Sequence, residues 1–179
     1  MLPTKYIILC GLFAAIIAIL AQISIPVPFS PVPITGQTFG VFLAGAILGG
    51  RWGAVSMLTY IFIGAIGFPV FSFAQGGLHM LLGPSGGYIW GFIPGSYLLG
   101  KFIERRGSYF SMVAGMIICI GAIYSLGTLQ LAIISGLNLY QAILLGILPF
   151  LPMDLLKAIA AAGFSLAVRR RLLKMGLIQ

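Results

Sequence analysis

Long apolar stretches with very few charges constrain this chain more than any other feature of its sequence. Only 7% of the 179 residues are charged and 60% are hydrophobic, whereas a typical soluble domain carries about 25% charged residues. A helix needs roughly 20 mostly apolar residues to cross a bilayer. The sequence therefore predicts an all-α integral membrane protein that folds as one domain over residues 1–179, without a soluble catalytic domain.

Cutting the apolar runs at proline, glycine and charged residues predicts six membrane-spanning helices. Their expected ranges are 5–23, 36–50, 53–68, 86–104, 109–132 and 152–170. Residues 24–33 contain four prolines and favour an extended path. Residues 69–85 form a loop rich in Gly and Pro. In the third connection, residues 133–151, Asn138 is expected to begin a short amphipathic helix.

The basic residues predict how the bundle is oriented. Three connections on one side (24–33, 69–85 and 133–151) contain no Lys, Arg, Asp or Glu. The basic residues expected on the other side are Lys5, Arg51, Lys101, Arg105, Arg106, Arg169, Arg170, Arg171 and Lys174. Lys and Arg concentrate in cytoplasmic loops, so both termini are expected in the cytoplasm and the protein in the inner or plasma membrane. The net charge of +8 thus reflects orientation, and a nucleic-acid partner is not expected.

Asp154 and Lys157 depart from this pattern, because they fall near the extracytoplasmic start of the last expected helix. A charged side chain deep in a bilayer costs about 2.5–3.5 kcal/mol and is a functional-site hypothesis by default. Residues three apart share a helix face and can neutralise each other. The acid suits the positive end of the helix dipole and the amine does not, so a bound carboxylate would complement Lys157. The alternative is a buried ion pair that only fixes the end of the helix.

Polar side chains on the same side supply further candidates for a binding site. The amide of Gln37 both donates and accepts, which suits a urea-like or amide-like group. Ser85 and several aromatic residues, among them Phe73, belong to the same region. The predicted ligand-contacting residues are Asp154, Lys157, Gln37, Tyr88, Gln75, Gly86 and Thr35.

Small residues four positions apart predict close contacts between helices. Such spacing places them on one helix face and lets backbones approach in lipid. The pattern occurs at Ala14/Ala18, Gly36/Gly40, Gly45/Gly49/Gly53 and Gly87/Gly91/Gly95. Packing within the bundle explains all of these. A partner helix that docks on Ala14 and Ala18 is the alternative for the first pair.

Two motifs suggest chemistry that other residues argue against. Gly95 and Gly100-Lys101 match most of a phosphate-binding loop, but Phe102 stands where Ser or Thr is required, so no ATP binding is expected. Gly-Pro-Ser-Gly at residues 83–86 resembles the serine motif of rhomboid intramembrane proteases. A nucleophilic Ser85 needs a base within reach, and the single histidine, His79, precedes it in the same loop. The position of His79 argues against activation of Ser85, and an intramembrane hydrolase is the rival hypothesis. The acidic, His and Cys residues are too few and too scattered for a metal site, and no cofactor is expected.

Three segments resemble the BioY family. They are PVPITGQTFGVFLAGAILGGRWGA at residues 31–54, GGLHMLLGPSGGYIWGF at residues 76–92 and the Pro-x-Asp-x-x-Lys stretch at residues 152–157. BioY proteins are the biotin-binding S-components of energy-coupling factor transporters, and the resemblance extends over essentially the whole chain in length and helix count. It implies a six-helix S-component that is a transporter subunit and not an enzyme, with its vitamin site near the outer face.

The resemblance also implies roles for individual residues. Asp154 would bind the ureido N–H groups of biotin, and Lys157 an acceptor, either the valerate carboxylate or the ureido oxygen. The Ala14-x-x-x-Ala18 face would meet a membrane-embedded coupling subunit that works with two ABC-type ATPases. Family members often carry Arg or another residue at the position of Gln75, so a second basic contact is not expected here. An S-component for another vitamin would share this topology and is the nearest alternative.

Overall fold

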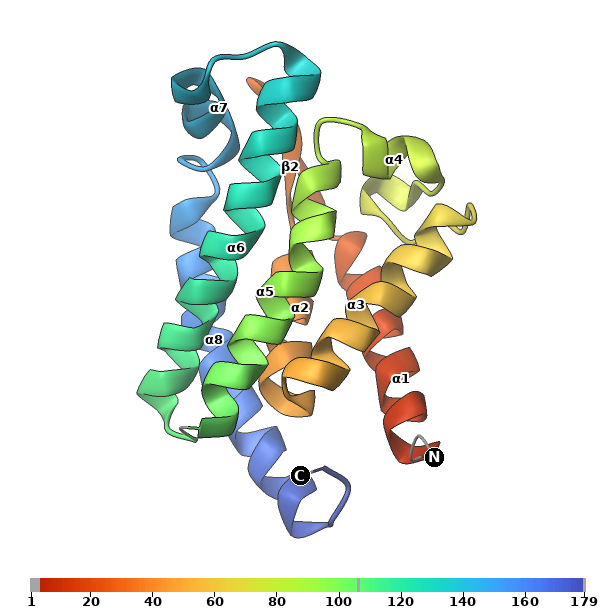
Figure 1. The fold of residues 1–179 in the computed structure, drawn as a ribbon, viewed down its shortest axis with the longest axis vertical. Helices are drawn as coiled ribbons and strands as arrows, with labels where there is room; N and C mark the ends of the chain where they lie inside the picture. Colours follow the sequence, from red (N-terminus) through yellow and green to blue (C-terminus); the bar gives the residue numbers. More distant parts are fainter. Residues whose placement is uncertain (1–3, 106, 179) are drawn as a thin grey trace.

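Each expected helical range contains a helix in the computed structural model, which describes residues 4–105 and 107–178 (Figure 1). The long helices are α1 (Thr4–Ala21), α2 (Gln37–Leu48), α3 (Gly50–Ala65), α5 (Gly86–Arg105), α6 (Tyr109–Ser135) and α8 (Leu151–Lys174). The short elements are β1 (Ser24–Val27), β2 (Ser30–Thr35), the 3-10 helix η1 (Ser72–Ala74), α4 (Leu78–Leu82) and α7 (Leu139–Gly146). Within the described residues, three helices are long and apolar enough to cross a membrane: α1, α6 and α8.

The proline-rich segment after α1 is extended, as predicted. β1 and β2 pair antiparallel, with Ser24 opposite Thr35 and Ile25 opposite Ile34. A two-stranded hairpin leaves one edge of each strand unpaired, so prolines that lack an N–H are tolerated there. The strand β2 continues two residues beyond the predicted segment, to Thr35, and so delivers this residue directly to the start of α2.

The predicted short helix after Asn138 is confirmed as α7. The side chain of Asn138 accepts a hydrogen bond from the backbone N–H of Gln141 at 2.9 Å, and the Gln141 side chain accepts from the Asn138 N–H at 3.2 Å. This reciprocal capping box satisfies two N–H groups that a helix start otherwise leaves without partners. α6 ends just before it, because Gly136 takes a left-handed conformation with φ 64°.

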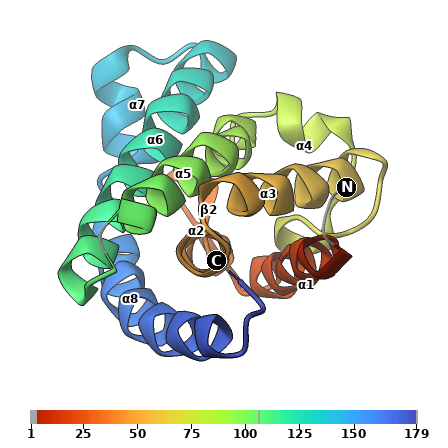
Figure 2. The ribbon, with the colours of Figure 1, turned by 60° about the horizontal axis from the view of Figure 1, so that its bottom comes forward.

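The helix α2 lies at the centre of the bundle (Figure 2). It is surrounded by α1, α3, α5 and α8, all of which contact it, and nearly all of its residues are buried. Small residues permit this: a Cβ on Gly53 of α3 would lie 2.9 Å from the Cα of Gly45, and one on Gly40 would lie 2.8 Å from the Ile17 side chain. The close-packing interpretation of the glycine pattern is therefore confirmed at these positions.

Ala14 also packs inside the bundle. Its side chain is 2% exposed and belongs to the main core, and Ala18 is partly buried against the same core. The structure thus fits internal packing at Ala14, and this residue is not accessible to an external helix in the arrangement described.

Basic and acidic side chains tie helices together at the end of the bundle where α1 begins and α8 finishes (Figure 1). Arg169 Nη1 donates to the carbonyl oxygens of Ala46 and Ile47 at the last turn of α2. Glu104 accepts from the Gly50 N–H at 3.0 Å and pairs with Lys101 at 2.8 Å. The hairpin, α4 and α7 lie at the opposite end (Figure 1).

Candidate ligand-binding site

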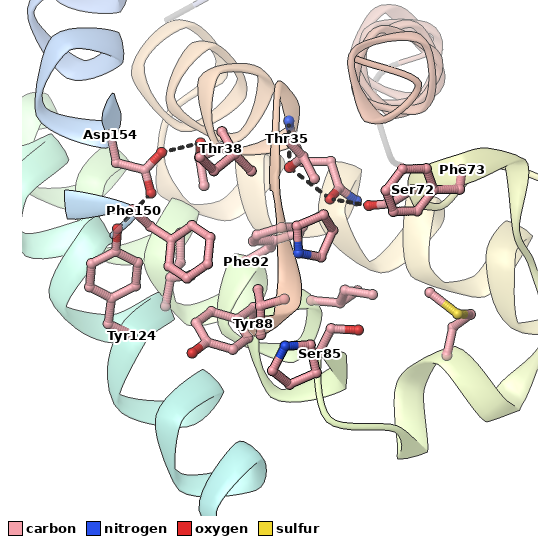
Figure 3. Close-up of a pocket in the computed structure, with 18 of the residues that line it drawn as sticks. Thr35, Thr38, Ser72, Phe73, Ser85, Tyr88, Phe92, Tyr124, Phe150 and Asp154 are labelled. Carbon is pink, nitrogen blue, oxygen red and sulfur yellow. Dashed lines mark hydrogen bonds between the residues drawn. The ribbon is translucent and has the colours of Figure 1, made fainter. Parts of the chain in front are cut away.

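A cavity of about 240 Å³ opens between β2, α2, α5, α6 and α8 at the end of the bundle that carries α4. Six of the seven predicted ligand-contacting residues line it: Thr35, Gln37, Gln75, Tyr88, Asp154 and Lys157. Apolar side chains, including Ile89, Phe92 and Phe150, form most of the remaining wall. Figure 3 shows the labelled side chains arranged around this space. Residues more than 100 positions apart in the sequence therefore meet at one site.

The carboxylate of Asp154 is held by three hydrogen bonds. Thr38 Oγ1 donates to Oδ1 at 2.9 Å, Lys157 Nζ donates to the same oxygen at 2.7 Å, and Tyr124 Oη donates to Oδ2 at 2.8 Å. Asp154 is only 4% exposed. A buried charge is tolerated when it is paired and hydrogen-bonded. The three donors therefore hold a charged acceptor in one orientation against the cavity, as Figure 3 shows for Thr38.

The ammonium group of Lys157 donates three hydrogen bonds within the protein. Its Nζ donates to the Thr35 carbonyl oxygen at 2.7 Å, to Thr38 Oγ1 at 3.1 Å and to Asp154 Oδ1 at 2.7 Å. An ammonium group has three donors, so these contacts use all of them. A ligand acceptor reaches Lys157 only if one of the contacts is given up. A direct contact between Lys157 and a ligand, as expected from the sequence, therefore requires the Lys157 side chain to rearrange.

Gln37 connects four segments at the cavity wall. Its Nε2 donates to Tyr60 Oη at 2.6 Å, and its Oε1 accepts from Thr35 Oγ1 at 3.0 Å and from Ser72 Oγ at 3.2 Å. Tyr60 in turn donates to the Val70 carbonyl at 2.9 Å. An amide nitrogen carries two N–H donors. One donates to Tyr60, which in turn bonds the loop before η1 at Val70, and the other remains for a ligand.

Tyr88 forms an apolar wall and its hydroxyl group is bonded within the protein. The hydroxyl donates to the Gly146 carbonyl at 2.8 Å, and the ring meets that of Tyr124 edge to face with centroids 6.3 Å apart. A Cβ on Gly127 would collide with the Tyr88 ring. The ring therefore occupies space that a glycine on α6 leaves open, and a ligand would touch its face.

The rim of the cavity is formed by the segment around η1. Gln75 is exposed, Phe73 is 51% exposed and Ser85 is half-buried. Phe73 takes a left-handed conformation with φ 58°, which is unusual for a bulky residue. Gln22, which directly follows α1, holds this segment, because its Oε1 accepts from the Ala74 N–H at 3.0 Å and its Nε2 donates to the Phe71 carbonyl at 3.3 Å.

Gly86 does not line the cavity. A Cβ there would collide with the Leu81 carbonyl oxygen, so this glycine permits the start of α5 to pack against α4. That Gly86 contacts the ligand stays a prediction, and its lack of a side chain serves the packing of α5 against α4.

Sequence reasoning missed Thr38 and Tyr124, the two hydroxyl donors to Asp154. Thr38 follows Gln37 directly, and Tyr124 is a hydroxyl-bearing aromatic within the long apolar run of α6. A buried polar group in an apolar helix needs a hydrogen-bond partner, and this rule could have singled out the hydroxyls of Thr38 and Tyr124. Which partner it finds depends on how α6 docks on α8.

The residues required by the rival hypotheses are not brought together. Ser85 lines the cavity, whereas His79 is exposed on α4 and lies outside the described lining. In the described ranges, no group of three His, Cys, Asp or Glu side chains is arranged to hold a metal ion. The side chains that line the cavity supply hydrogen-bonding groups and apolar surface.

Comparison with known proteins places this architecture in a family. Residues 1–174 match the model of the BioY family. The chain belongs to the BioY family. A biotin transporter BioY from Thermotoga maritima is 38% identical over 93% of this chain and 96% of its own. One from Rhizobium etli is 37% identical over 93% and 94% of the two chains, and a probable one from Pyrococcus horikoshii is 39% identical over 89% and 93%.

A solved structure shares the fold. The crystal structure of the S-component for biotin from an ECF-type ABC transporter superposes with a TM-score of 0.87 at 28% identity, over 93% of this chain and 92% of that one. The mostly helical BioY fold described above is therefore that of an S-component. Membership of a transporter family, together with the apolar helices α1, α6 and α8, makes the chain a membrane protein.

Proposed function

We propose that this chain captures biotin with high affinity and mediates its uptake across the cell membrane, as the substrate-specific subunit of an energy-coupling factor transporter. The names of its relatives and the S-component of similar fold support this. The observation that carries the proposal is Asp154: a carboxylate 4% exposed that faces a cavity lined mainly by uncharged side chains.

The binding mode follows from the unused hydrogen-bonding capacity of the site. Asp154 Oδ2 accepts one hydrogen bond, from Tyr124, and a carboxylate oxygen has two acceptor positions. The free position takes a ureido N–H of biotin. Gln37 retains one N–H, which suits the ureido oxygen. The fused rings and alkyl chain of biotin lie against Tyr88, Phe92 and Phe150, because ligand pockets are mostly apolar with a few polar groups that fix orientation.

In this proposal the helices α1, α2, α3, α5, α6 and α8 all cross the membrane. Both termini are cytoplasmic, and the cavity opens to the outside. The grouping of Lys101, Glu104 and Arg169 at the end opposite the cavity supports that orientation, since basic residues favour the cytoplasmic side.

Energy comes from partner proteins in this account. A membrane-embedded coupling subunit with two ABC-type ATPases drives release of biotin inside, and the chain itself hydrolyses nothing. The coupling subunit contacts α1 on the face near Ala18, and Ala14 joins that contact only if α1 moves relative to the core in which it is buried.

Titration of biotin into the purified protein tests the proposal. We expect tight binding by the wild type, weak binding by Asp154→Asn and Lys157→Ala, and unchanged binding by Glu104→Gln, which makes the same carboxylate-to-amide change at the opposite end of the bundle. Competition with other vitamins distinguishes biotin from another ligand. A wild-type protein that fails to retain biotin, or Asp154→Asn and Lys157→Ala variants that bind like wild type, would remove the proposal.

The hydrolase alternative has its own test. If Ser85 were a nucleophile, a fluorophosphonate probe would label the wild type and not Ser85→Ala. We expect no labelling of either protein and biotin uptake in Ser85→Ala that matches the wild type.

A further inference from the structure

The residues that line the cavity differ in charge and in exposure. Asp154, Tyr124 and Gln37 are buried, each 6% exposed or less. At the rim lie Phe73 and Gln75, which are exposed, and Ser85, which is half-buried. All three rim side chains are uncharged. A long ligand whose head group binds Asp154 would extend its other end toward these exposed residues.

The one cation among the described lining residues is not available to a ligand carboxylate. Lys157 Nζ already donates to the Thr35 carbonyl, Thr38 Oγ1 and Asp154 Oδ1, at 2.7, 3.1 and 2.7 Å. Its charge is compensated by Asp154 at the same position. Lys157 thus orients the acid that binds the ligand, and its side chain is only 16% exposed.

Among the described residues that line the cavity, no side chain other than Lys157 is Lys, Arg or His. The sequence contains no Lys or Arg in residues 24–35, 69–85 or 133–151, which include β1, β2, η1, α4 and α7. A carboxylate at the rim would meet Gln75, Ser85 and water. Gln75 is exposed, so water competes for these hydrogen bonds and their net contribution to affinity is small.

We propose that this site recognises the ureido head of its ligand and makes no specific contact with the carboxyl end. It therefore also binds biotin whose carboxyl group is joined in an amide, such as biotinyl-lysine. This inference rests on the proposed function and deepens it.

One feature of the rim would produce the opposite behaviour. α5 begins at Gly86, next to Ser85, and the backbone N–H groups at a helix start can receive an anion. If they bind the valerate carboxylate, blocking that group removes a charge-assisted contact, which is worth about 10- to 100-fold in affinity. The two arrangements therefore predict different ratios of affinity for the same pair of ligands.

The test uses the wild-type protein, which avoids any folding defect. Biotin, biotinamide and biotinyl-lysine are titrated by calorimetry, and lipoate serves as the matched control because it carries a pentanoate chain without a ureido group. We expect the two amides to bind within about tenfold of biotin and lipoate not to compete. Amides that bind more than about tenfold more weakly, or lipoate that competes, overturn the inference while biotin binding keeps the proposed function. Absence of biotin binding removes both.

Discussion

Tyr124 Oη on α6 lies 2.8 Å from Oδ2 of Asp154 on α8 and donates a hydrogen bond to it. Both side chains are buried, at 6% and 4% exposure. Because Thr38 and Lys157 bind the other carboxylate oxygen, Tyr124 alone restrains Oδ2 among the described residues. The tyrosine therefore fixes the direction in which the remaining acceptor position of Asp154 faces the cavity.

Replacing Tyr124 with Phe tests this positioning. The change removes one hydroxyl, and hydrogen bonds to charged groups contribute about 1.5–3 kcal/mol. We expect biotin affinity to fall by about 10- to 100-fold when measured by calorimetry. The matched variant Tyr140→Phe, at a side chain that is 71% exposed on α7, should bind like wild type. Equal affinities for the two variants would show that Tyr124 does not position the acid.

Thr38 connects the two charged residues, since it donates to Asp154 and accepts from Lys157. Thr38→Val keeps the shape and loses both contacts, so we expect at least a tenfold loss of biotin affinity and a lower melting temperature. Thr59→Val is the control, because Thr59 Oγ1 donates only to the Val55 carbonyl in its own helix. If the two valine variants behave alike, the hydroxyl of Thr38 has no role in the site.

Gly127 leaves room for the ring of Tyr88. We expect Gly127→Ala to displace the ring and to weaken biotin binding, even though alanine favours a helix over glycine by about 1 kcal/mol. Gly121→Ala makes the same change on the same helix, where a Cβ meets nothing within 4 Å, and should bind normally. Binding by Gly127→Ala at wild-type affinity would mean that the Tyr88 wall does not touch the ligand.

The Asp154–Lys157 pair predicts a pattern in stability. Lys157→Met leaves a buried carboxylate without its cation, at a cost of about 3–5 kcal/mol, which thermal unfolding in detergent would report. Asp154→Asn combined with Lys157→Met should be less destabilised than Lys157→Met alone. Lys101→Met breaks a more exposed pair, with side chains 49% and 36% exposed, and should change stability by at most about 1 kcal/mol. A double variant as unstable as Lys157→Met would contradict the coupling.

Much of the fold could be predicted because local chemistry determines it. Apolar runs predicted the helices, the prolines of residues 24–33 predicted an extended path, and Asn138 predicted the start of α7; the pairing of β1 with β2 into a hairpin came only from the structure. Helix ends were less accurate: α2 was expected to reach residue 50 but ends at Leu48, because Gly49 takes a φ of 83°. Gly49 and Gly50 are adjacent there, and the sequence alone does not predict which of them takes the positive φ that ends the helix.

The site could be predicted only in part. Asp154 and Lys157 stand out in sequence because charges are rare in apolar helices. Their partners Thr38 and Tyr124 do not, since α2 and α6 meet α8 only through tertiary packing. The same limit explains Gly86, whose role depends on the carbonyl of Leu81, and Lys157, whose three acceptors come from β2, α2 and α8.

The most direct test of this account is to titrate the wild-type protein with biotin and with a biotin methylated on both ureido nitrogens. The methylated compound keeps the rings and the carboxylate but has no N–H to give to Asp154. We predict that its affinity is lower than that of biotin by at least about 100-fold. Equal binding of the two compounds would contradict the central claim that Asp154 recognises the ureido head of the ligand.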